Sequence, residues 1–508
     1  MIEQFILIFS FTLFINWIAY LALGKIFALD RPNLRKIHQK EIPQIGGFVF
    51  GLIFLFYLLI IGNIPIWFFI GCFFSILVGI IDDNFGLSWY YKIISQILLL
   101  SHLIILNWNK INEIIFFNYS ISADPIILSI LFTFWFFGIY NSVNLIDGVD
   151  GLAGGYCLLI CLSFSAMFNN EIFVKLNLFL SIIIVVFLIF NQRPAKFFMG
   201  DAGSLFLGYY LAVSPLLYNE LSNNNFSYID ITSFVILFSF IIADTLRVFF
   251  TRIISGKSPM TADTIHFHHL VLKGSGSYLV TLSMIFLVTL ISGIAAVLNV
   301  NYEYKAVGML IQLSFLFLFI LTPPAPTYVN IIWKALKPVY YWQKSYLKID
   351  ISNVHTLFIF LMQNILFLSI FYTIDMHEIL NWDLFISILI ISLFCYFNYN
   401  DKIIISIIQL FISILTIEYF WSFDFNLITK IITIFLLISL AVFTFQKRFG
   451  TIIYEYSALD LLVFFISIGS LYLYKIGYQI NFWIALIILS LWFSISFIMR
   501  RLFFITQK

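Results

Sequence analysis

Polar and charged residues gather in four short stretches of an otherwise apolar chain, and their types are those that bind metal ions and phosphates. The first stretch is Asp82-Asp83-Asn84, followed by Lys92 and Gln96. Adjacent carboxylates repel each other, so such a pair needs a nearby cation or an unequal sharing of protons. Taken alone, the stretch could also be a solvated helix end.

The second stretch runs from Asn141 to Gly155 and combines amide, carboxylate and glycine residues. Asn141, Asn144 and Asp147 recur every three residues, so the end of a helix would present them on one face. Asp150 follows among glycines, which let the backbone approach a ligand closely. Oxygen ligands of this kind suit Mg²⁺ rather than zinc. An ordinary Asn/Asp/Gly turn is the alternative.

The third stretch, residues 191–204, contains Asn191, Arg193, Lys196 and Asp201. Asp201 is flanked by glycines before a new apolar run, where backbone N–H groups can face a phosphate. Arg193 and Lys196 could instead be ordinary basic anchors on the inner side of a membrane.

The fourth stretch begins at Asp244 and ends in Asp263-Thr-Ile-His266-Phe-His268-His269. Three of the seven histidines therefore lie within four residues. A zinc site is one interpretation, but this stretch contains no cysteine and no second ligand pair at zinc spacing. Histidines beside a phosphate-rich ligand fit the pattern better.

Long apolar segments carry these stretches. Of the 508 residues 62% are hydrophobic and only 10% are charged, whereas a soluble protein has about 25% charged residues. Since roughly 20 apolar residues cross a bilayer as a helix, we expect about seventeen spans. They lie near residues 4–24, 46–62, 64–81, 89–107, 126–142, 152–169, 172–190, 203–219, 230–249, 276–298, 306–322, 355–373, 383–399, 402–420, 427–445, 457–474 and 481–499.

Lysine and arginine orient these spans. With the N-terminus outside, all but five of the 27 basic residues fall on the inner side. The five exceptions are Lys110, Lys175, Lys305, Lys430 and Lys475. Because basic residues concentrate on the cytoplasmic side, we expect the N-terminus outside, the C-terminus inside and all four stretches at the cytoplasmic face. The net charge of +2 does not suggest a nucleic-acid partner.

The fold class we predict is an all-α polytopic membrane protein that divides near residue 325. Residues 1–325 would form a catalytic bundle of about 11 helices, because all four stretches precede the division. Residues 326–354 contain prolines and lysines and are expected to be a cytoplasmic linker. Residues 355–508 would add about six spans of unknown role, either a lipid-embedded scaffold or a partner surface.

The four stretches resemble motifs of the polyprenyl-phosphate N-acetylhexosamine-1-phosphate transferase family, a part of glycosyltransferase family 4. They match its DD segment, its NxxNxxDGxDGL loop, its FNxxPAkxFMGDxGS loop and its HxHH loop, in the family's order. The loop from Asp30 to Gly47 looks like the family's first cytoplasmic segment. The resemblance covers the chain up to the predicted division.

The resemblance implies an enzyme of the bacterial inner membrane. The phosphate of a polyprenyl phosphate would attack the sugar-linked phosphorus of a UDP-sugar, and UMP would leave. Asp201 and Asn144 would bind Mg²⁺, or Mn²⁺ in its place. Asp82 and Asp83 would handle the lipid phosphate or its proton, and Lys92 would hold phosphate. The remaining implied site residues shape the nucleotide and sugar pocket: Asp147 and Asp150, counted as catalytic, and Asn141, Asn191, Asp263, His266, His268 and His269.

The spacing His266-x-His268-His269 looks like the branch of the family that uses UDP-N-acetylglucosamine. Such an enzyme would initiate a cell-envelope glycan such as lipopolysaccharide O-antigen or teichoic acid. One departure is Thr264, which stands where branch members usually have arginine; Arg252 and Lys257 are nearby basic residues that could compensate.

Two further interpretations remain open. Phospho-N-acetylmuramoyl-pentapeptide transferase, with three consecutive histidines, is the alternative enzyme. A secondary transporter is a remote alternative, because transporters place polar residues near the bilayer midplane, whereas these stretches fall at the ends of spans. Substrates and membrane lipid are the expected partners, and a homodimer is compatible with the sequence.

Overall fold

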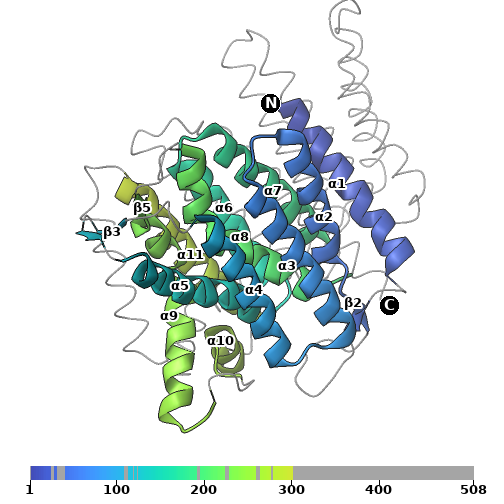
Figure 1. Ribbon diagram of the computed structural model, residues 1–508. Helices are drawn as coiled ribbons and strands as arrows, with labels where there is room; N and C mark the ends of the chain where they lie inside the picture. Colours follow the sequence, from blue (N-terminus) through green and yellow to red (C-terminus); the bar gives the residue numbers. More distant parts are fainter. Residues whose placement is uncertain are drawn as a thin grey trace, which may run out of the picture. The chain divides into compact units, whose positions relative to one another are not determined.

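The computed structural model describes residues 2–24, 28–30, 41–107, 113–117, 119–122, 124–191, 195–222, 228–258, 264–275 and 278–300. The chain divides into two compact units, Ile15–Asn330 and residues 1–14 with 331–508. Every described helix from α2 (Gly46–Ile61) onward belongs to the first unit. Figure 1 shows the described helices and strands, coloured along the sequence. The described part of the second unit is the first half of helix α1. The predicted linker and the six spans beyond it lie outside the described residues and stay predictions.

Each predicted span up to residue 298 coincides with a helix, although α9 continues five residues further than expected, to Ile254. Helices α3, α5, α7 and α9, with residues 281–300 of α11, are long and apolar enough to cross a membrane. The chain is therefore a multi-pass membrane protein. The helices are α1 (Ile2–Leu23), α2 (Gly46–Ile61), α3 (Ile66–Phe85), α4 (Trp89–Asn107), α5 (Pro125–Ile146), α6 (Leu152–Met167), α7 (Glu171–Asn191), α8 (Gly200–Ser222), α9 (Thr232–Ile254) and α11 (Tyr278–Val300).

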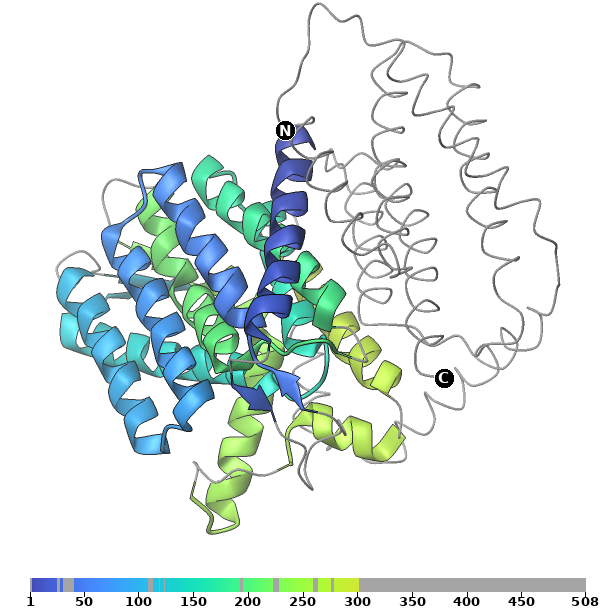
Figure 2. The same ribbon diagram turned by 90° about the vertical axis from the view of Figure 1, so that its right-hand side faces the viewer.

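The connections between helices contain structure that the all-α prediction did not include. Strands β1 (Leu29–Asp30) and β2 (Ile42–Pro43) form an antiparallel pair at the end of the bundle where the short helix α10 (Phe267–Ser275) lies (Figure 2). A second sheet has the order β4-β3-β5, with β3 (Glu113–Phe116) antiparallel to β4 (Tyr119–Ser122) and parallel to β5 (Tyr228–Asp230). Strands of two to four residues are too short to produce a detectable alternation of polar and apolar residues.

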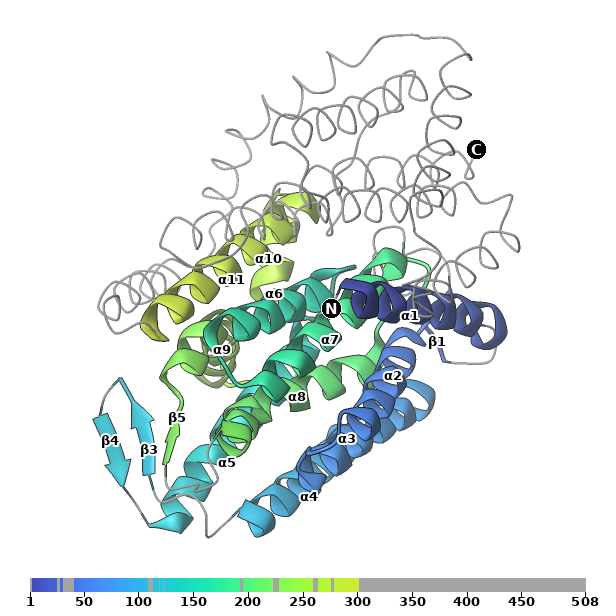
Figure 3. The same cartoon turned by 90° about the horizontal axis from the view of Figure 1, so that it is seen from above.

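Helix α8 is the centre of the described bundle. Every residue from Ala202 to Leu217 is buried, and the helix packs against α2, α3 and α5 (Figure 3). Its first turn touches two neighbouring backbones, because a Cβ atom added to Gly79 of α3 would lie 2.2 Å from the Ala202 Cα. A Cβ atom added to Gly47 of α2 would likewise lie 2.0 Å from the Gly203 nitrogen.

The segment before α8 is joined to the start of α2 by backbone hydrogen bonds. The Gly46 N–H donates to the Phe198 carbonyl at 2.9 Å, and the Gly47 N–H donates to the Met199 carbonyl at 2.8 Å. The Phe198 N–H in turn donates to the Pro43 carbonyl at 2.9 Å. These bonds satisfy N–H groups that a helix start leaves unpaired, and they fix the position at which α8 begins.

The close contact at Gly79 predicts a position-specific effect of alanine. Gly79→Ala should destabilise the protein by about 1–3 kcal/mol, as overpacked cores do, and should lower activity, because α3 and the start of α8 must separate. Gly138→Ala in α5 is the matched control, since a Cβ atom there meets nothing within 4 Å. Melting temperatures in detergent measure both effects, and equal melting temperatures for the two variants would contradict the packing described.

Candidate active site

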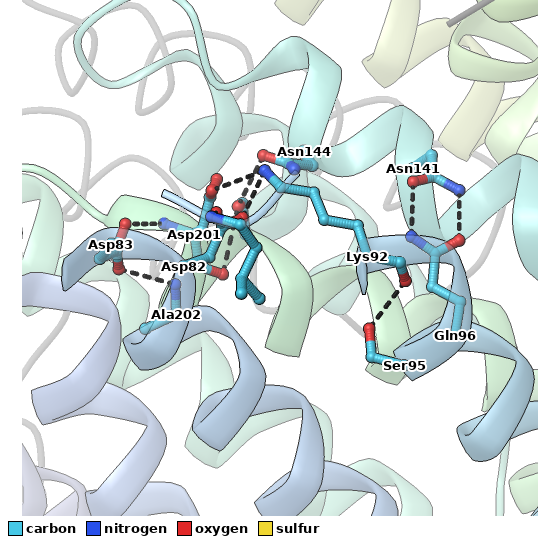
Figure 4. Close-up of polar contacts among 11 residues, drawn as sticks. Asp82, Asp83, Lys92, Ser95, Gln96, Asn141, Asn144, Asp201 and Ala202 are labelled. Atoms are coloured by element: carbon cyan, nitrogen blue, oxygen red, sulfur yellow. Dashed lines mark hydrogen bonds and ion pairs between the residues drawn. The ribbon is translucent and has the colours of Figure 1, made fainter. Parts of the chain in front are cut away.

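Five of the predicted site residues meet at neighbouring helix ends. Asp82 and Asp83 end α3, Lys92 lies in the first turn of α4, Asn144 lies in the last turn of α5, and Asp201 lies in the first turn of α8. Figure 4 shows the Lys92 side chain reaching toward Asp82 and Asp201. The structure thus brings together residues from three of the four stretches that the sequence singles out.

Lys92 links two of the carboxylates. Its Nζ atom forms ion pairs with Asp82 and, at 3.3 Å, with Asp201 Oδ2. The Asp82 side chain is only 3% exposed, whereas those of Lys92 and Asp201 are 31% and 28% exposed. A ligand can therefore reach the ammonium group and Asp201, while Asp82 lies behind them. Asp82 also accepts the Leu87 N–H through Oδ1 at 2.9 Å.

Asp83 points away from Lys92 and toward the backbone of α8. Its Oδ1 atom accepts the Asp201 N–H at 2.7 Å, and its Oδ2 atom accepts the Ala202 N–H at 3.0 Å (Figure 4). The two adjacent aspartates, which the sequence treats as one pair, thus have different partners.

The oxygen atoms near Lys92 suit a magnesium ion. Asn144 Oδ1 accepts the Ser204 hydroxyl at 3.0 Å, one turn of α8 beyond Asp201. Mg²⁺ is usually held by one or two carboxylates together with waters and substrate phosphates. In the described part of the chain no three His, Cys, Asp or Glu side chains form a group that could hold a metal by themselves. The carboxylates of Asp82, Asp83 and Asp201 also outnumber the single ammonium group beside them.

Two predicted substrate-binding amides make contacts within the protein. Asn141 and Gln96 exchange two amide hydrogen bonds of 2.9 Å, and Asn141 Nδ2 also donates to the Phe137 carbonyl at 2.8 Å. Asn191 Oδ1 accepts the Gly151 N–H at 2.8 Å, and its Nδ2 donates to the Phe197 carbonyl at 3.1 Å. Both amides therefore hold neighbouring backbone or side chains in place; substrate contact by either one stays a prediction.

Asp147 lies directly after α5, between the carboxylate cluster and the histidines. Burial raises its pKa to about 7, with further contributions from the nearby carboxylates of Asp83 and Asp150. The next residue touches the histidine segment, since a Cβ atom on Gly148 would lie 2.7 Å from His268 Nε2. The Asp150 carbonyl accepts the Tyr278 hydroxyl. The structure therefore places the second and fourth stretches side by side.

Asp244 of α9 organises the histidine segment. It accepts the Phe267 N–H at 3.1 Å, lies 3.0 Å from His266 Nδ1, and pairs with Arg247 at 2.7 Å. Arg247 also donates to the Ile265 carbonyl at 2.7 Å. Neither the pairing of Asp244 with Arg247 nor its contact with the histidines was predicted, although a charged pair three residues apart inside an apolar helix is a detectable signal.

The first two histidines of the HxHH segment are buried and present unpaired nitrogen atoms. Nε2 of His266 and Nε2 of His268 are buried without a hydrogen-bond partner. Burial, together with the neighbouring His269, lowers the pKa of His268 to about 3, so its ring is neutral at physiological pH. His268 would therefore contact a ligand as a neutral imidazole and not as a cation. Asp263 and Arg193 lie outside the described residues.

Comparison with known proteins gives one family throughout. The model of "Glycosyl transferase family 4" matches residues 65–219. A Bacillus subtilis protein named "Probable undecaprenyl-phosphate N-acetylglucosaminyl 1-phosphate transferase" is 32% identical over 293 residues, which cover 54% of this chain and 77% of that protein. Two further relatives are named "Undecaprenyl-phosphate alpha-N-acetylglucosaminyl 1-phosphate transferase". The protein from Thermotoga maritima is 28% identical over 51% of this chain and 79% of its own length. The protein from Salmonella typhi is 29% identical over 60% of this chain and 84% of its own length.

The neutral His268 predicts a specific dependence of stability on pH. An unfolded histidine takes up a proton below about pH 6.5, whereas folded His268 stays neutral until about pH 3. Acidification from pH 6.5 toward 5 should therefore destabilise the folded state, by at most about 1.4 kcal/mol per pH unit from this group. The melting temperature of His268→Gln should fall less than that of the wild type over this interval. Parallel curves for the two proteins would show that His268 is charged in the folded state.

Proposed function

This chain belongs to glycosyl transferase family 4, and we propose that it transfers N-acetylglucosamine-1-phosphate, or a related N-acetylhexosamine-1-phosphate, from a UDP-sugar to undecaprenyl phosphate. UMP is the second product. The observation that carries the proposal is the meeting of Asp82, Lys92 and Asp201 at adjacent helix ends. Together with the named relatives, this cluster supports a phosphotransferase.

The residues around Lys92 have the charges that phosphoryl transfer requires. The Lys92 ammonium group is partly exposed and lies between the carboxylates of Asp82 and Asp201, so an incoming phosphate can reach it. Aligning the lipid phosphate with the sugar-linked phosphorus provides much of the rate enhancement in such a reaction. Fixed charges that match the developing charge provide most of the rest.

In this proposal Asp201 and Asn144 hold Mg²⁺ beside the pyrophosphate. When bound, the ion neutralises negative charge on the pyrophosphate oxygens. Asp201 offers a partly exposed carboxylate, and the Asn144 oxygen is oriented by the Ser204 hydroxyl. The protein contributes the position of these oxygens.

The nucleotide and sugar then lie against the second and fourth stretches. Asp147, Gly148 and Asp150 belong to the second stretch, and Gly148 lies against His268 of the segment that Asp244 anchors through His266. The buried, unpaired Nε2 atoms of these histidines can hydrogen-bond a neutral group of the donor, such as a sugar hydroxyl, an amide or a uracil atom.

The proposed membrane orientation rests on the basic residues. Because most lysines and arginines fall on one side of the predicted spans and basic residues concentrate on the cytoplasmic side, we propose that catalysis takes place at the cytoplasmic face of the bacterial inner membrane. The N-terminus is then outside and the C-terminus inside. The lipid product would initiate a cell-envelope glycan such as O-antigen or teichoic acid.

The donor sugar is tested with purified protein, undecaprenyl phosphate and a panel of UDP-sugars. We expect UMP release to be fastest with UDP-N-acetylglucosamine, slower with its epimers and negligible with UDP-N-acetylmuramoyl-pentapeptide. Preference for the pentapeptide donor would assign the chain to the alternative enzyme. Absence of release with every donor, in protein shown to bind UMP, would refute the proposed transfer.

The metal is tested separately. Activity should disappear with EDTA and return with Mg²⁺ or Mn²⁺. Asp201→Asn should lower kcat by more than about a hundredfold, the usual cost of losing a preorganised charge at the reacting group. Glu171→Gln, which removes an exposed carboxylate at the start of α7, is the matched control and should retain wild-type activity. Metal-independent turnover, or a fully active Asp201→Asn, would contradict the assignment.

A further inference from the structure

The first turn of α8 is capped from another helix. The Asp201 and Ala202 N–H groups have no helical carbonyl to bond, as at any helix start, and Asp83 of α3 accepts both of them at 2.7 and 3.0 Å. A helix is usually capped by the residue just before it. Here that residue is the buried Met199, whose side chain has no suitable oxygen. The cap is therefore supplied from 118 residues earlier in the chain.

The contact between Asp83 and the start of α8 requires glycine at two neighbouring positions, Gly200 and Gly79. Gly200 has φ +68°, a conformation that favours glycine, and a Cβ atom there would lie 2.6 Å from Asp83 Oδ2. Gly79, one turn before Asp83 in α3, lies on the same helix face and against Ala202. A single face of α3 therefore docks on the start of α8, with a glycine for the backbone contact and a carboxylate for the N–H groups.

The partners of Asp82 show why the two aspartates differ. Successive helix residues point about 100° apart, so Asp82 faces Lys92 when Asp83 faces α8. Both oxygens of Asp83 accept backbone N–H groups, and one of these belongs to Asp201. The side chain of Asp201 in turn pairs with Lys92.

We propose that Asp83 is a positioning residue that fixes the first turn of α8, and thereby the Asp201 carboxylate, and that it does not bind the lipid phosphate. This inference rests on the proposed function only in assigning Asp201 a part in the transfer. Lys92 is then the residue of this cluster that faces the lipid phosphate, and the buried Asp82 pairs with it from behind. The negative charge of Asp83 at the positive end of the α8 dipole adds to the stability of the contact.

The decisive comparison is between Asp83→Asn and Asp83→Ala in the full-length protein. Asparagine keeps one acceptor oxygen and caps helices about as well as aspartate, whereas alanine caps poorly. A capping role therefore predicts that Asp83→Asn retains at least about tenfold more activity than Asp83→Ala. A residue that must accept a proton or carry charge for catalysis predicts equal losses in the two variants.

Two measurements without substrate report the cap itself. Amide hydrogen exchange in a peptide covering residues 200–206 should be slow in the wild type, moderately faster in Asp83→Asn and much faster in Asp83→Ala. Binding of Mn²⁺, followed by electron paramagnetic resonance, should weaken in the same order. Asp124→Ala is the matched control: Asp124 caps α5 by accepting the Ile126 N–H at 2.8 Å, so its loss should speed exchange at the start of α5 and leave α8 protected.

Equal activity losses in the two Asp83 variants, with exchange in residues 200–206 at the wild-type rate, would overturn the inference. So would a fully active Asp83→Ala. If Asp83→Ala does not insert, a folded Asp83→Asn that is inactive yet keeps wild-type exchange and Mn²⁺ affinity would overturn it equally. Failure of the proposed function is a separate outcome, in which the wild type transfers no sugar phosphate while its exchange still reports the cap.

Discussion

The backbone N–H groups at the start of α8 lie among buried residues. An unpaired polar group there would lower the stability of the fold by about 1–3 kcal/mol. Asp83 satisfies two of them, and the loop before α8 is joined to α2 by backbone hydrogen bonds. The Cβ-free contact at Gly79 lets the helices approach closely enough for these bonds to form. The position of Asp201, and with it the distance to Lys92, depends on this arrangement.

Charge decides what this arrangement can bind. Three carboxylates and one ammonium group lie together at the end of a bundle of apolar helices, and charges in such surroundings are retained for function. Lys92 is shared between Asp82 and Asp201, so an incoming phosphate would compete with both carboxylates for the same ammonium group. The excess of carboxylates suits a divalent cation that arrives with the substrate.

The sequence predicts the helices up to residue 298 and singles out a candidate site, for physical reasons. A membrane span needs an apolar run of fixed length, so every span up to residue 298 coincides with a helix. The site residues are visible because polar groups at the ends of such runs are few. Their separate tasks are not visible, because these depend on partners distant in the chain. Gln96 bonds Asn141 from 45 residues away, Asn191 bonds Gly151 from 40, and Asp83 bonds Asp201 from 118.

In the reaction that we propose, the enzyme breaks the pyrophosphate of the donor and not the sugar–oxygen bond. UDP-N-acetylglucosamine labelled with ³²P in its β-phosphate distinguishes the two. Incubation with undecaprenyl phosphate should move the label into the lipid extract and release unlabelled UMP in equal amount. Recovery of the label in water-soluble UDP would show transfer of the sugar alone and would contradict the account.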